Sequence, residues 1–352
     1  MRSNYLILML SLLVIAGIIA GAYVIFHPKK AEVPPVQEKP PKAAETPVGQ
    51  GEGTLAALWA GKAHFEILPE QVGPLVPGMH YLSMFWDGNH YKAYYITGVE
   101  GNIWTGLAKS ADGFNFESAG VVLKTGSPGS WDDRMASFSS VWKEKGTYYL
   151  VYEGAGTSFW WLGDIGLATS HDGVNFEKEG LFLKHDTAEN SFEKTNIGTP
   201  SLFKDGDMWY LFYHGFDGKT CQISVATGGD LKNLKKVGYP VIPTVANTWR
   251  SGTTGKRSRP IKEGEYWYIT FEASTDQPYD KANWCTGIGR SKDLINWEVY
   301  PDPVIPQTQG EFGDDGPEMI NIKGDIYIYF RTPASSPLGG NNTQRAKLVR
   351  NP

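Results

Sequence analysis

Large apolar residues alternate with smaller or polar ones along most of the chain after residue 53, in short runs separated by tight, glycine-containing turns. This alternation has the two-residue period of a half-buried strand, and the turns are short enough to join antiparallel neighbours. A polar turn followed by an aromatic strand occurs in five copies, at Trp86–Gly98, Lys143–Gly154, Lys204–Gly215, Lys262–Ala273 and Ile322–Thr332. No stretch of this region has a convincing helical period, so the pattern predicts an all-β domain.

A second repeated motif contains an aspartate in a turn. Its copies are Leu107–Phe116, Leu167–Phe176, Val225–Leu234 and Ile288–Trp297. The aspartates Asp112, Asp172, Asp230 and Asp293 are separated by 60, 58 and 63 residues. An aspartate in such a turn can accept hydrogen bonds from its own backbone. A repeat of about 60 residues that carries four strands predicts a propeller blade, and five aromatic strands predict five blades.

The outermost strand of the fifth blade has no counterpart after the last repeat. The one comparable segment left is N-terminal, at His64–Pro77. We therefore expect this segment to lie beside strands built from about Glu318 to Val349. That pairing would close the ring and leave no open sheet edge at the seam. The expected fold is a five-bladed β-propeller over residues 54–352, closed by an N-terminal strand.

The N-terminus has a different character. Tyr5–Phe26 is a run of 22 mostly apolar residues without a charge, and a helix of that length spans about 33 Å, enough for a bilayer core. Ala20–Ala22 could be a signal-peptidase site, but the apolar run continues past it, which favours an uncleaved membrane anchor. Residues 29–53 are rich in proline and should form an extended linker. We expect a membrane anchor or signal segment at 1–28 and an extracytoplasmic domain, secreted if the segment is cleaved.

Composition excludes some partners. The net charge of −5 argues against a nucleic-acid partner, which would require a basic face. The aromatic share of 13% suits both β-strands and sugar-binding clefts. Cys221 and Cys285 are the two cysteines, and no Cys/His cluster indicates zinc. A disulfide between them is possible in an exported domain, but two buried thiols are favoured. We expect no metal and no cofactor.

Ionisable residues recur where the second strand ends in four of the five expected blades, and Thr97 holds this position in the first. Glu153, His214, Glu272 and Arg331 share this position. The starts of the innermost strands add His80, Asp133, Arg134, Arg257, Arg259, Asp315 and Glu318. These groups should converge on a funnel at the face with the longer loops, where functional sites tend to lie. The alternative is that the charges are solvated or paired with one another.

Cleavage of a glycosidic bond requires a proton donor with a raised pKa and a second carboxylate that stays ionised. Asp133 lies beside Arg134, which would stabilise its charge and suits a base. Glu318 is the expected acid, because repulsion from Asp315 would raise its pKa. Trp131 could stack on a sugar ring, although a single tryptophan is more often used in packing.

The S-x-D-G-x-N-F turns and the aromatic strands resemble those of five-bladed propeller glycoside hydrolases over about residues 54–352. That superfamily includes arabinanases and xylosidases of family 43, invertase-like enzymes of family 32 and mannoside phosphorylases of family 130. The resemblance implies hydrolysis or phosphorolysis of an oligo- or polysaccharide substrate. It also implies a carboxylate at the start of the first inner strand, where His80 stands instead.

Two alternatives follow from these residues. A non-catalytic, membrane-tethered glycan-binding propeller is the alternative to an enzyme. Arg257 and Arg259 belong to a basic group that could bind phosphate or a sugar carboxylate through their planar guanidinium groups. The same two residues could equally lie in a solvated loop.

Overall fold

The computed structural model describes residues 53–72, 79, 81–99, 101–156, 163–277, 282–307, 315–332 and 343–352. The chain divides into two units, Met1–Ala44 and Glu45–Pro352, and all of the described residues belong to the second. The expected anchor or signal segment at 1–28 lies outside them, as does the linker apart from Gly53. Within these described ranges, no helix is both long enough and apolar enough to span a bilayer.

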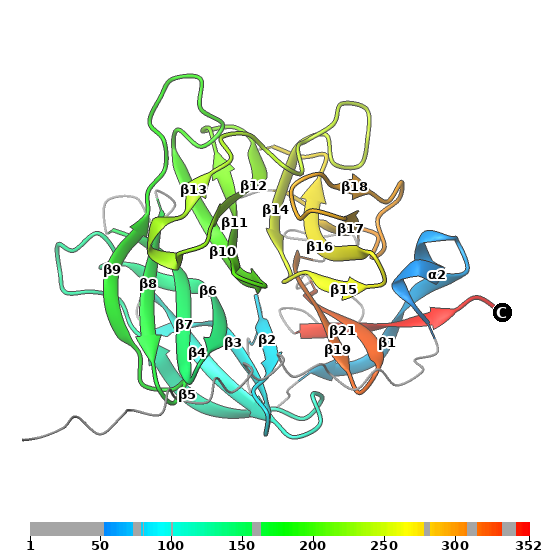
Figure 1. Ribbon diagram of the computed structural model, residues 1–352, viewed down its shortest axis with the longest axis horizontal. Helices are drawn as coiled ribbons and strands as arrows, with labels where there is room; N and C mark the ends of the chain where they lie inside the picture. Colours follow the sequence, from blue (N-terminus) through cyan, green and yellow to red (C-terminus); the bar gives the residue numbers. More distant parts are fainter. Residues whose placement is uncertain are drawn as a thin grey trace, which may run out of the picture. The chain divides into compact units, whose positions relative to one another are not determined.

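The described part of the domain is almost entirely β-structure, which confirms the predicted all-β class (Figure 1). Its helices are α2 (Leu55–Trp59) and a single 3-10 turn, η1 (Leu231–Asn233). Antiparallel pairing arranges the strands in five groups, which we call meanders 1 to 5. Meanders 1 and 2 join into one eight-stranded sheet, because β4 and β6 meet in parallel at Ile103 and Met135.

Each meander follows the order of the chain from its innermost strand outward, except at the end of the last. Meander 1 holds β2 (Ser83–Trp86), β3 (Tyr91–Val99), β4 (Asn102–Ser110) and β5 (Glu117–Leu123). Meander 2 holds β6 (Met135–Glu144), β7 (Thr147–Ala155), β8 (Asp164–Ser170) and β9 (Glu177–Leu183). Meander 3 holds β10 (Asn196–Asp205), β11 (Met208–Phe216), β12 (Cys221–Gly228) and β13 (Lys235–Lys236).

Meander 4 has an interrupted innermost strand. It holds β14 (Thr253–Arg257), β15 (Ile261–Glu263), β16 (Tyr266–Ser274), β17 (Cys285–Ser291) and β18 (Glu298–Val299). Meander 5 holds β19 (Asp315–Ile322), β20 (Asp325–Arg331), β21 (Thr343–Arg350) and β1 (Ala63–Val72).

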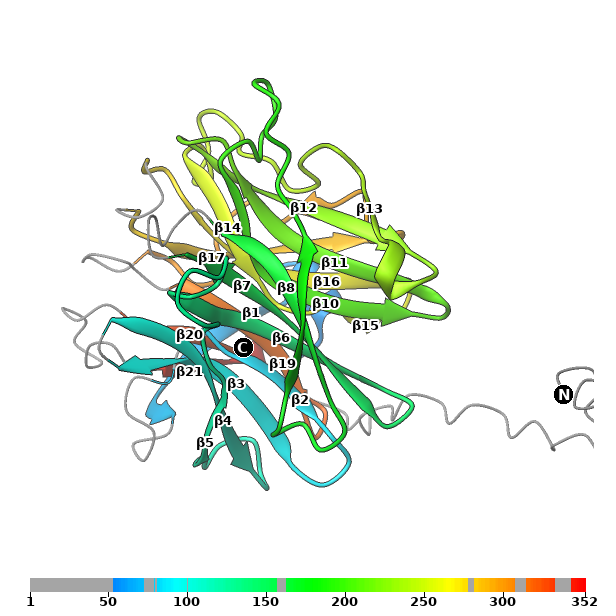
Figure 2. The same cartoon turned by 90° about the vertical axis from the view of Figure 1, so that its left-hand side faces the viewer.

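The N-terminal strand completes the last meander, as the repeat pattern predicts. β1 pairs antiparallel with β21, from Ala63 opposite Arg350 to Leu68 opposite Arg345. β21 lies between β1 and β20, and the three strands fall in one region of the side view although most of the domain separates β1 from the other two in sequence (Figure 2). The prediction that the first strand closes the last group is therefore confirmed.

Helix α2 fixes the start of the domain to meander 4. Thr54 caps the helix by accepting the N–H of Ala57 at 3.0 Å. The carboxylate of Glu263 accepts the N–H groups of Leu55 and Ala56, at 3.0 and 2.8 Å. These three bonds satisfy donors that a helix of five residues would otherwise leave unpaired.

The innermost strands contact one another in a closed order. β2 contacts β6, which contacts β10, then β14, then β19, and β19 contacts β2 again. In Figure 1 these strands lie around the middle of the domain, with the outer strands further away. Residues at the start of these five strands are therefore close together although up to about 230 positions separate them in sequence.

The repeated aspartates have the predicted role in turns. Asp112 accepts the backbone N–H groups of Phe114 and Asn115, both at 2.8 Å, and the side-chain amide of Asn115 at 2.8 Å. Asp172 and Asp293 make the same three contacts in their own turns. The motif is therefore structural, since it closes the turn before an outer strand.

Much of the aromatic content is used in packing between meanders. Trp142 of β6 lies 5.6 Å from Phe203 and 6.5 Å from Trp209, both edge to face across the boundary between meanders 2 and 3. Cys221 and Cys285 are buried and no disulfide joins them, so the favoured expectation of two buried thiols is confirmed. Because packing between meanders already uses such rings, the aromatic share of 13% is by itself no sign of a sugar-binding cleft.

We predict that β1 is essential for the stability of the domain. Deleting residues 1–50 should leave the melting temperature unchanged, whereas deleting residues 1–72 should lower it by at least about 10 °C, because β21 keeps β20 but loses β1 as a pairing partner. Scanning calorimetry of the two deletions side by side measures the difference. Equal melting temperatures would show that the seam closes without β1.

Candidate active site

The innermost strands lose their regular pairing near their starts. The pairing skips between Ser137 and Ser140, Gly198 and Ser201, Thr254 and Arg257, and Asp315 and Glu318. Within these bulges φ is positive at Phe138 (47°), Thr199 (42°) and Gly316 (64°), and Tyr81, just before β2, has φ of 52°. A non-glycine residue in this region is uncommon and strained, and such strain is concentrated at functional sites.

The predicted ionisable residues lie at these bulges. Glu153 pairs with Ser137, His214 with Gly198 and Arg331 with Asp315, in each case just before the bulge. Glu272 reaches the bulge of β14 through its side chain. The structure arranges them in two clusters, one around Thr199 and the other around Asp315 and Gly316.

The first cluster combines Glu153, His214 and Arg257 around Thr199. Glu153 is 5% exposed, and its Oε2 accepts the N–H of Thr199 at 2.8 Å. Burial raises the pKa of Glu153 to about 7, although this N–H and the charge of Arg257 oppose the shift. Nδ1 of His214 lies 2.8 Å from Oγ1 of Thr199, and burial together with Arg257 lowers the His214 pKa to about 3. The imidazole is therefore neutral near pH 7.

Arg257 is 2% exposed and donates from Nη2 to the carbonyl of Thr199. Burial lowers the pKa of Arg257 to about 9, against the charges of Glu272 and Glu153. Among the described residues, its Nε and Nη1 have no hydrogen-bond partner. These two N–H groups are donors that a bound molecule could use.

The second cluster surrounds Asp315, which is fully buried. Arg331 donates to both carboxylate oxygens, from Nε at 2.8 Å and from Nη2, and the hydroxyl of Tyr81 donates at 2.8 Å. Burial raises the pKa of Asp315 to about 7; Arg331 opposes the shift and repulsion from Glu272 adds to it. Glu272 accepts the N–H groups of Lys256 and Gly316, both at 2.8 Å, and burial raises its pKa too.

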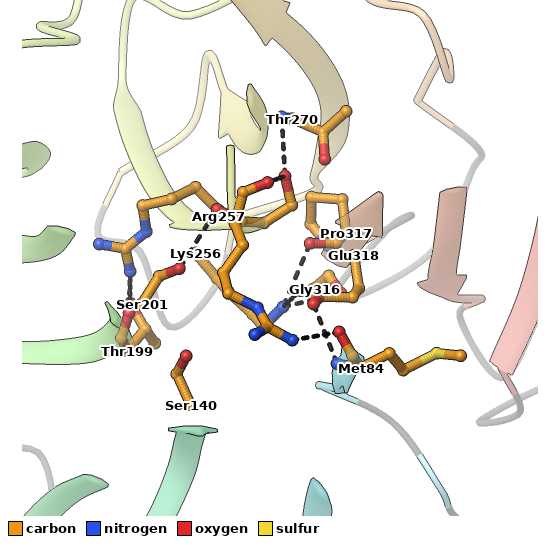
Figure 3. A network of polar contacts seen from close by, with 12 residues as sticks. Met84, Ser140, Thr199, Ser201, Lys256, Arg257, Thr270, Gly316, Pro317 and Glu318 are labelled. Atoms are coloured by element: carbon orange, nitrogen blue, oxygen red, sulfur yellow. Dashed lines mark hydrogen bonds and ion pairs between the residues drawn. The ribbon is translucent and has the colours of Figure 1, made fainter. Parts of the chain in front are cut away.

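Glu318, the expected acid, contacts meander 1 from the innermost strand of meander 5 (Figure 3). Its Oε1 accepts the N–H of Met84 at 3.0 Å, and its Oε2 lies 3.6 Å from Nζ of Lys256. Arg259 donates to the carbonyls of Met84 and, at 3.1 Å, Val141, so it links meander 4 to meanders 1 and 2. Its guanidinium group is therefore occupied by the fold and does not lie in a solvated loop.

The pKa of Glu318 is raised, as expected, but the cause is burial, with Lys256 and Arg259 opposing it. Asp315 instead interacts with Arg331, Tyr81 and Glu272. The expected tuning of Glu318 by Asp315 is thus replaced by the effect of burial.

Glu318 occupies a position that serines hold in the other meanders. The equivalent residue is Ser83 in β2, Ser140 in β6, Ser201 in β10 and Ser258 after β14, where Arg257 is the first residue to pair again after the bulge. Oγ of Ser140 accepts the N–H of Leu202 in the next meander at 3.1 Å, just as Glu318 accepts that of Met84. This parallel assigns to Glu318 a contact that joins the last meander to the first.

Asp133, the expected base, lies in the loop before β6 and is half-buried. Its Oδ2 accepts the N–H of Gly129 at 2.6 Å. A Cβ on Gly156 would lie 3.7 Å from its Oδ1, so the carboxylate lies next to the end of β7, which carries Glu153. Arg134 is half-buried in the same loop. Trp131 stacks on Tyr152 with ring centroids 5.8 Å apart, which is packing.

Two functional candidates escaped the sequence analysis, and one expected residue is not described. Tyr81 and Phe138 lie at the bulge positions, where their rings touch with centroids 4.9 Å apart. Alignment of the innermost strands with one another could have found them, because Thr199 and Gly316 take the same position. His80 lies outside the described residues. No group of three or more His, Cys, Asp or Glu side chains in the described ranges could hold a metal ion.

Comparisons with known proteins give partial relatives. No family model matches the chain. It is similar to a 1,2-β-oligomannan phosphorylase of Thermoanaerobacter sp. (strain X514), 28% identical over 174 residues, which are 49% of this chain and 53% of that protein. A sucrose-6-phosphate hydrolase of Escherichia coli is 27% identical over 165 residues, 42% of this chain and 32% of the relative. The chain thus spans about half, or less, of the length of these curated relatives.

Solved structures match over most of the chain. A glycoside hydrolase has a TM-score of 0.64 at 17% identity, covering 84% of this chain and 95% of its own. A thermostable family-43 glycoside hydrolase scores 0.59 at 17% identity (79% and 91%), and a β-1,2-mannobiose phosphorylase from Listeria innocua scores 0.58 at 12% (81% and 96%). The chain therefore has the fold of these enzymes, and the resemblance predicted from sequence is confirmed.

We predict that Glu318 contributes to stability through its contact with Met84. Glu318→Gln keeps an oxygen that can accept this N–H, whereas Glu318→Ala leaves the N–H and Lys256 without that partner and should cost about 1–3 kcal/mol more. Urea denaturation measures the free energy of unfolding of both variants. Ser140→Ala removes the equivalent contact in meander 2 and serves as the comparison. If Glu318 were the proton donor, Glu318→Gln would abolish turnover with little effect on stability.

We also predict that the pH dependence of stability reports on Glu153. Its pKa is about 7 in the folded protein and about 4.3 in an unfolded chain, so the folded state binds more protons between these values. Its contribution is complete below about pH 4 and is lost as the pH rises through about 7. Glu153→Gln should reduce the fall in melting temperature between pH 5 and pH 8. Glu144→Gln, at the Lys204 ion pair, should leave that fall unchanged.

Proposed function

We propose that the chain is a carbohydrate-active enzyme that cleaves glycosidic bonds by hydrolysis or phosphorolysis. The observation that carries the proposal is the pair of buried carboxyls, Glu153 and Asp315, whose pKa burial raises to about 7. Cleavage needs an acid that is still protonated near neutral pH, and a raised carboxyl pKa supplies one. The similarity to a glycan phosphorylase and a sugar hydrolase supports this substrate class.

The five meanders are, in this proposal, the blades of a five-bladed propeller. The closed order of contacts among the innermost strands and the pairing of β1 with β21 support this arrangement. The bulges then surround the axis at one end and form the rim of a funnel. Substrate would enter at that end, beside Glu153 and its charge partner Arg257.

We assign the acid role to Glu153 and the base role to Asp133. Thr199 occupies Oε2 of Glu153, which leaves Oε1 to carry the proton for the leaving group. Asp133 is half-buried in the loop before β6, next to the end of β7. It would activate the group that attacks the sugar, which is water in hydrolysis or phosphate in phosphorolysis. Glu318 is a less suitable acid, because Met84 and Lys256 take both of its oxygens.

Charged neighbours would bind and orient the substrate. Arg257 has Nε and Nη1 without a hydrogen-bond partner among the described residues, and either could donate to a substrate oxygen or a phosphate. Arg331 keeps Asp315 in place, and His214 fixes the side chain of Thr199. The walls of the substrate site would be completed by Arg134, Glu272 and Trp131.

The domain is proposed to act outside the cytoplasmic membrane. The support is the sequence: the uncharged run Tyr5–Phe26 followed by a proline-rich linker. Such a layout would hold the domain near the membrane at a distance set by the linker.

Incubation with oligosaccharides tests the proposed activity. Residues 51–352 would be assayed with β-1,2-mannobiose, sucrose 6-phosphate and arabino-oligosaccharides, with and without phosphate, by counting reducing ends and sugar phosphates. Asp133→Asn and Glu153→Gln should each lower turnover by about 10²-fold or more. Glu144→Gln is the control that should not. Dependence on phosphate would identify a phosphorylase.

A glycan-binding propeller without catalysis is the second candidate. It is favoured by the fact that the fold already uses the buried carboxyls Glu272, Asp315 and Glu318 as hydrogen-bond acceptors. No turnover on any substrate, together with a sugar-dependent rise in melting temperature, would select this function over the enzyme.

A further inference from the structure

Three meanders meet at Thr199 in the first cluster. Its N–H donates to Oε2 of Glu153 in meander 2 at 2.8 Å. Its carbonyl and its Oγ1 both accept from Nη2 of Arg257 in meander 4 (Figure 3). Its Oγ1 also lies 2.8 Å from Nδ1 of His214 in its own meander. All four residues are at most 7% exposed, so bulk water does not compete for these hydrogen bonds.

The backbone of Thr199 is strained, and its N–H contact does not explain why. Thr199 has φ of 42°, where a β-branched residue is an outlier. Gly316 occupies the same position in meander 5 with φ of 64°, and its N–H donates to the carboxylate of Glu272 in the same way. A glycine is therefore sufficient for the main-chain contact. A threonine adds a hydroxyl at this position, and the hydroxyl is the group that reaches Arg257 and His214.

The partners of the Thr199 hydroxyl fix the direction of its hydrogen bonds. A guanidinium group has only donors, so Oγ1 accepts the bond from Arg257. Among the described residues, the other hydrogen-bond partner of Oγ1 is Nδ1 of His214. If Nδ1 carried a proton, Oγ1 would accept twice and the hydroxyl hydrogen would be buried without an acceptor, which costs free energy. The hydroxyl therefore donates to Nδ1.

The imidazole of His214 carries a single proton near pH 7. Burial and the charge of Arg257 lower its pKa to about 3, so the ring is neutral. Arg257 itself stays protonated, because its pKa of about 9 is still well above 7 and Glu272 and Glu153 partner its charge. A neutral imidazole that accepts at Nδ1 carries its proton on Nε2.

We propose that Thr199 is a positioning residue whose hydroxyl holds His214 in the tautomer with the proton on Nε2. His214 then presents a hydrogen-bond donor at Nε2 and does not act as a base, so the role of base is left to a carboxyl. Thr199 orients two groups at once, because its N–H also fixes the carboxyl of Glu153. The effect on turnover rests on the proposed function, whereas the tautomer depends on no substrate.

Nitrogen-15 NMR of the histidine side chains tests the tautomer. Residues 51–352 would be labelled at histidine, and the signals of His214 assigned by their loss in His214→Gln. At pH 7 we expect a protonated Nε2 and an unprotonated Nδ1 that is shifted upfield by the hydrogen bond from Thr199. A protonated Nδ1 in the wild-type protein would overturn the proposal.

Three variants test whether the hydroxyl is the cause. Thr199→Gly keeps the N–H, suits the positive φ and removes the hydroxyl, so the Nδ1 signal of His214 should move downfield. Thr199→Ser keeps the hydroxyl and should retain the wild-type signal. Ser201→Ala removes a buried hydroxyl of the same strand, which donates to the carbonyl of Ser258 at 3.3 Å, and should leave the signal unchanged. An unchanged signal in Thr199→Gly, or an equal shift in Ser201→Ala, would also overturn the proposal.

Kinetics separate this proposal from the proposed function. In an active enzyme, Thr199→Gly should lower kcat about ten-fold and Thr199→Ser should stay near wild type, because one hydrogen bond that orients the site is lost. An unchanged kcat in Thr199→Gly would reject its role in the reaction. The expected NMR signals without turnover by the wild-type protein would uphold the role of Thr199 in fixing His214 and reject the enzyme. Turnover that depends on Glu153, with unchanged NMR signals in Thr199→Gly, would uphold the enzyme and reject the role of Thr199.

Discussion

The arrangement of the innermost strands depends on one recurring contact: a side-chain oxygen in one meander accepts a main-chain N–H from the next. Glu153 accepts from Thr199, Glu272 from Gly316 and Glu318 from Met84, at 2.8, 2.8 and 3.0 Å. The innermost strands pair with a neighbour on one edge, so N–H groups on the other edge need partners, and a buried one left unpaired would cost free energy. A carboxylate is a strong acceptor for such a donor. The contact therefore fixes neighbouring meanders to each other at the level of single atoms.

Buried acceptors of this kind bring charges into the interior, and the fold balances them locally. Lys256, Arg257 and Arg259 follow one another on the innermost segment of meander 4 and reach Glu318, Glu153 and Glu272 as charge partners. Burial dominates all the same, so the carboxyl pKa values are raised and that of Arg257 is lowered. Glu153, with a pKa of about 7, is thus partly protonated near neutral pH because of its structural position. A group placed to join two meanders acquires, without further change, the pKa that a proton donor requires.

The repeats made much of this predictable. The aromatic strands and the Asp112-type turns predict the meanders, and the missing outer strand predicts the pairing of β1 with the C-terminal strands, because each depends on local periodicity. The convergence of Glu153, His214, Glu272 and Arg331 followed from their shared position in the repeat. The role of Glu318 did not, because its partners Met84 and Lys256 lie 234 and 62 residues away. Taken singly, Tyr81 and Phe138 carry no sign of their positive φ, and they stand out only by sharing a position with Thr199 and Gly316 in the aligned innermost strands.

The bulges connect the architecture with the chemistry. A regular innermost strand would point its side chains alternately to the two faces of its own sheet, toward neighbouring meanders. The extra residues interrupt this alternation and redirect a few side chains toward the end of the ring, which is how bulges commonly serve active sites. They also present the N–H groups of Thr199 and Gly316 to carboxylates of the preceding meanders. The same irregularity therefore joins neighbouring meanders and holds the buried acids in place, so a change at any bulge should affect stability and ligand binding together.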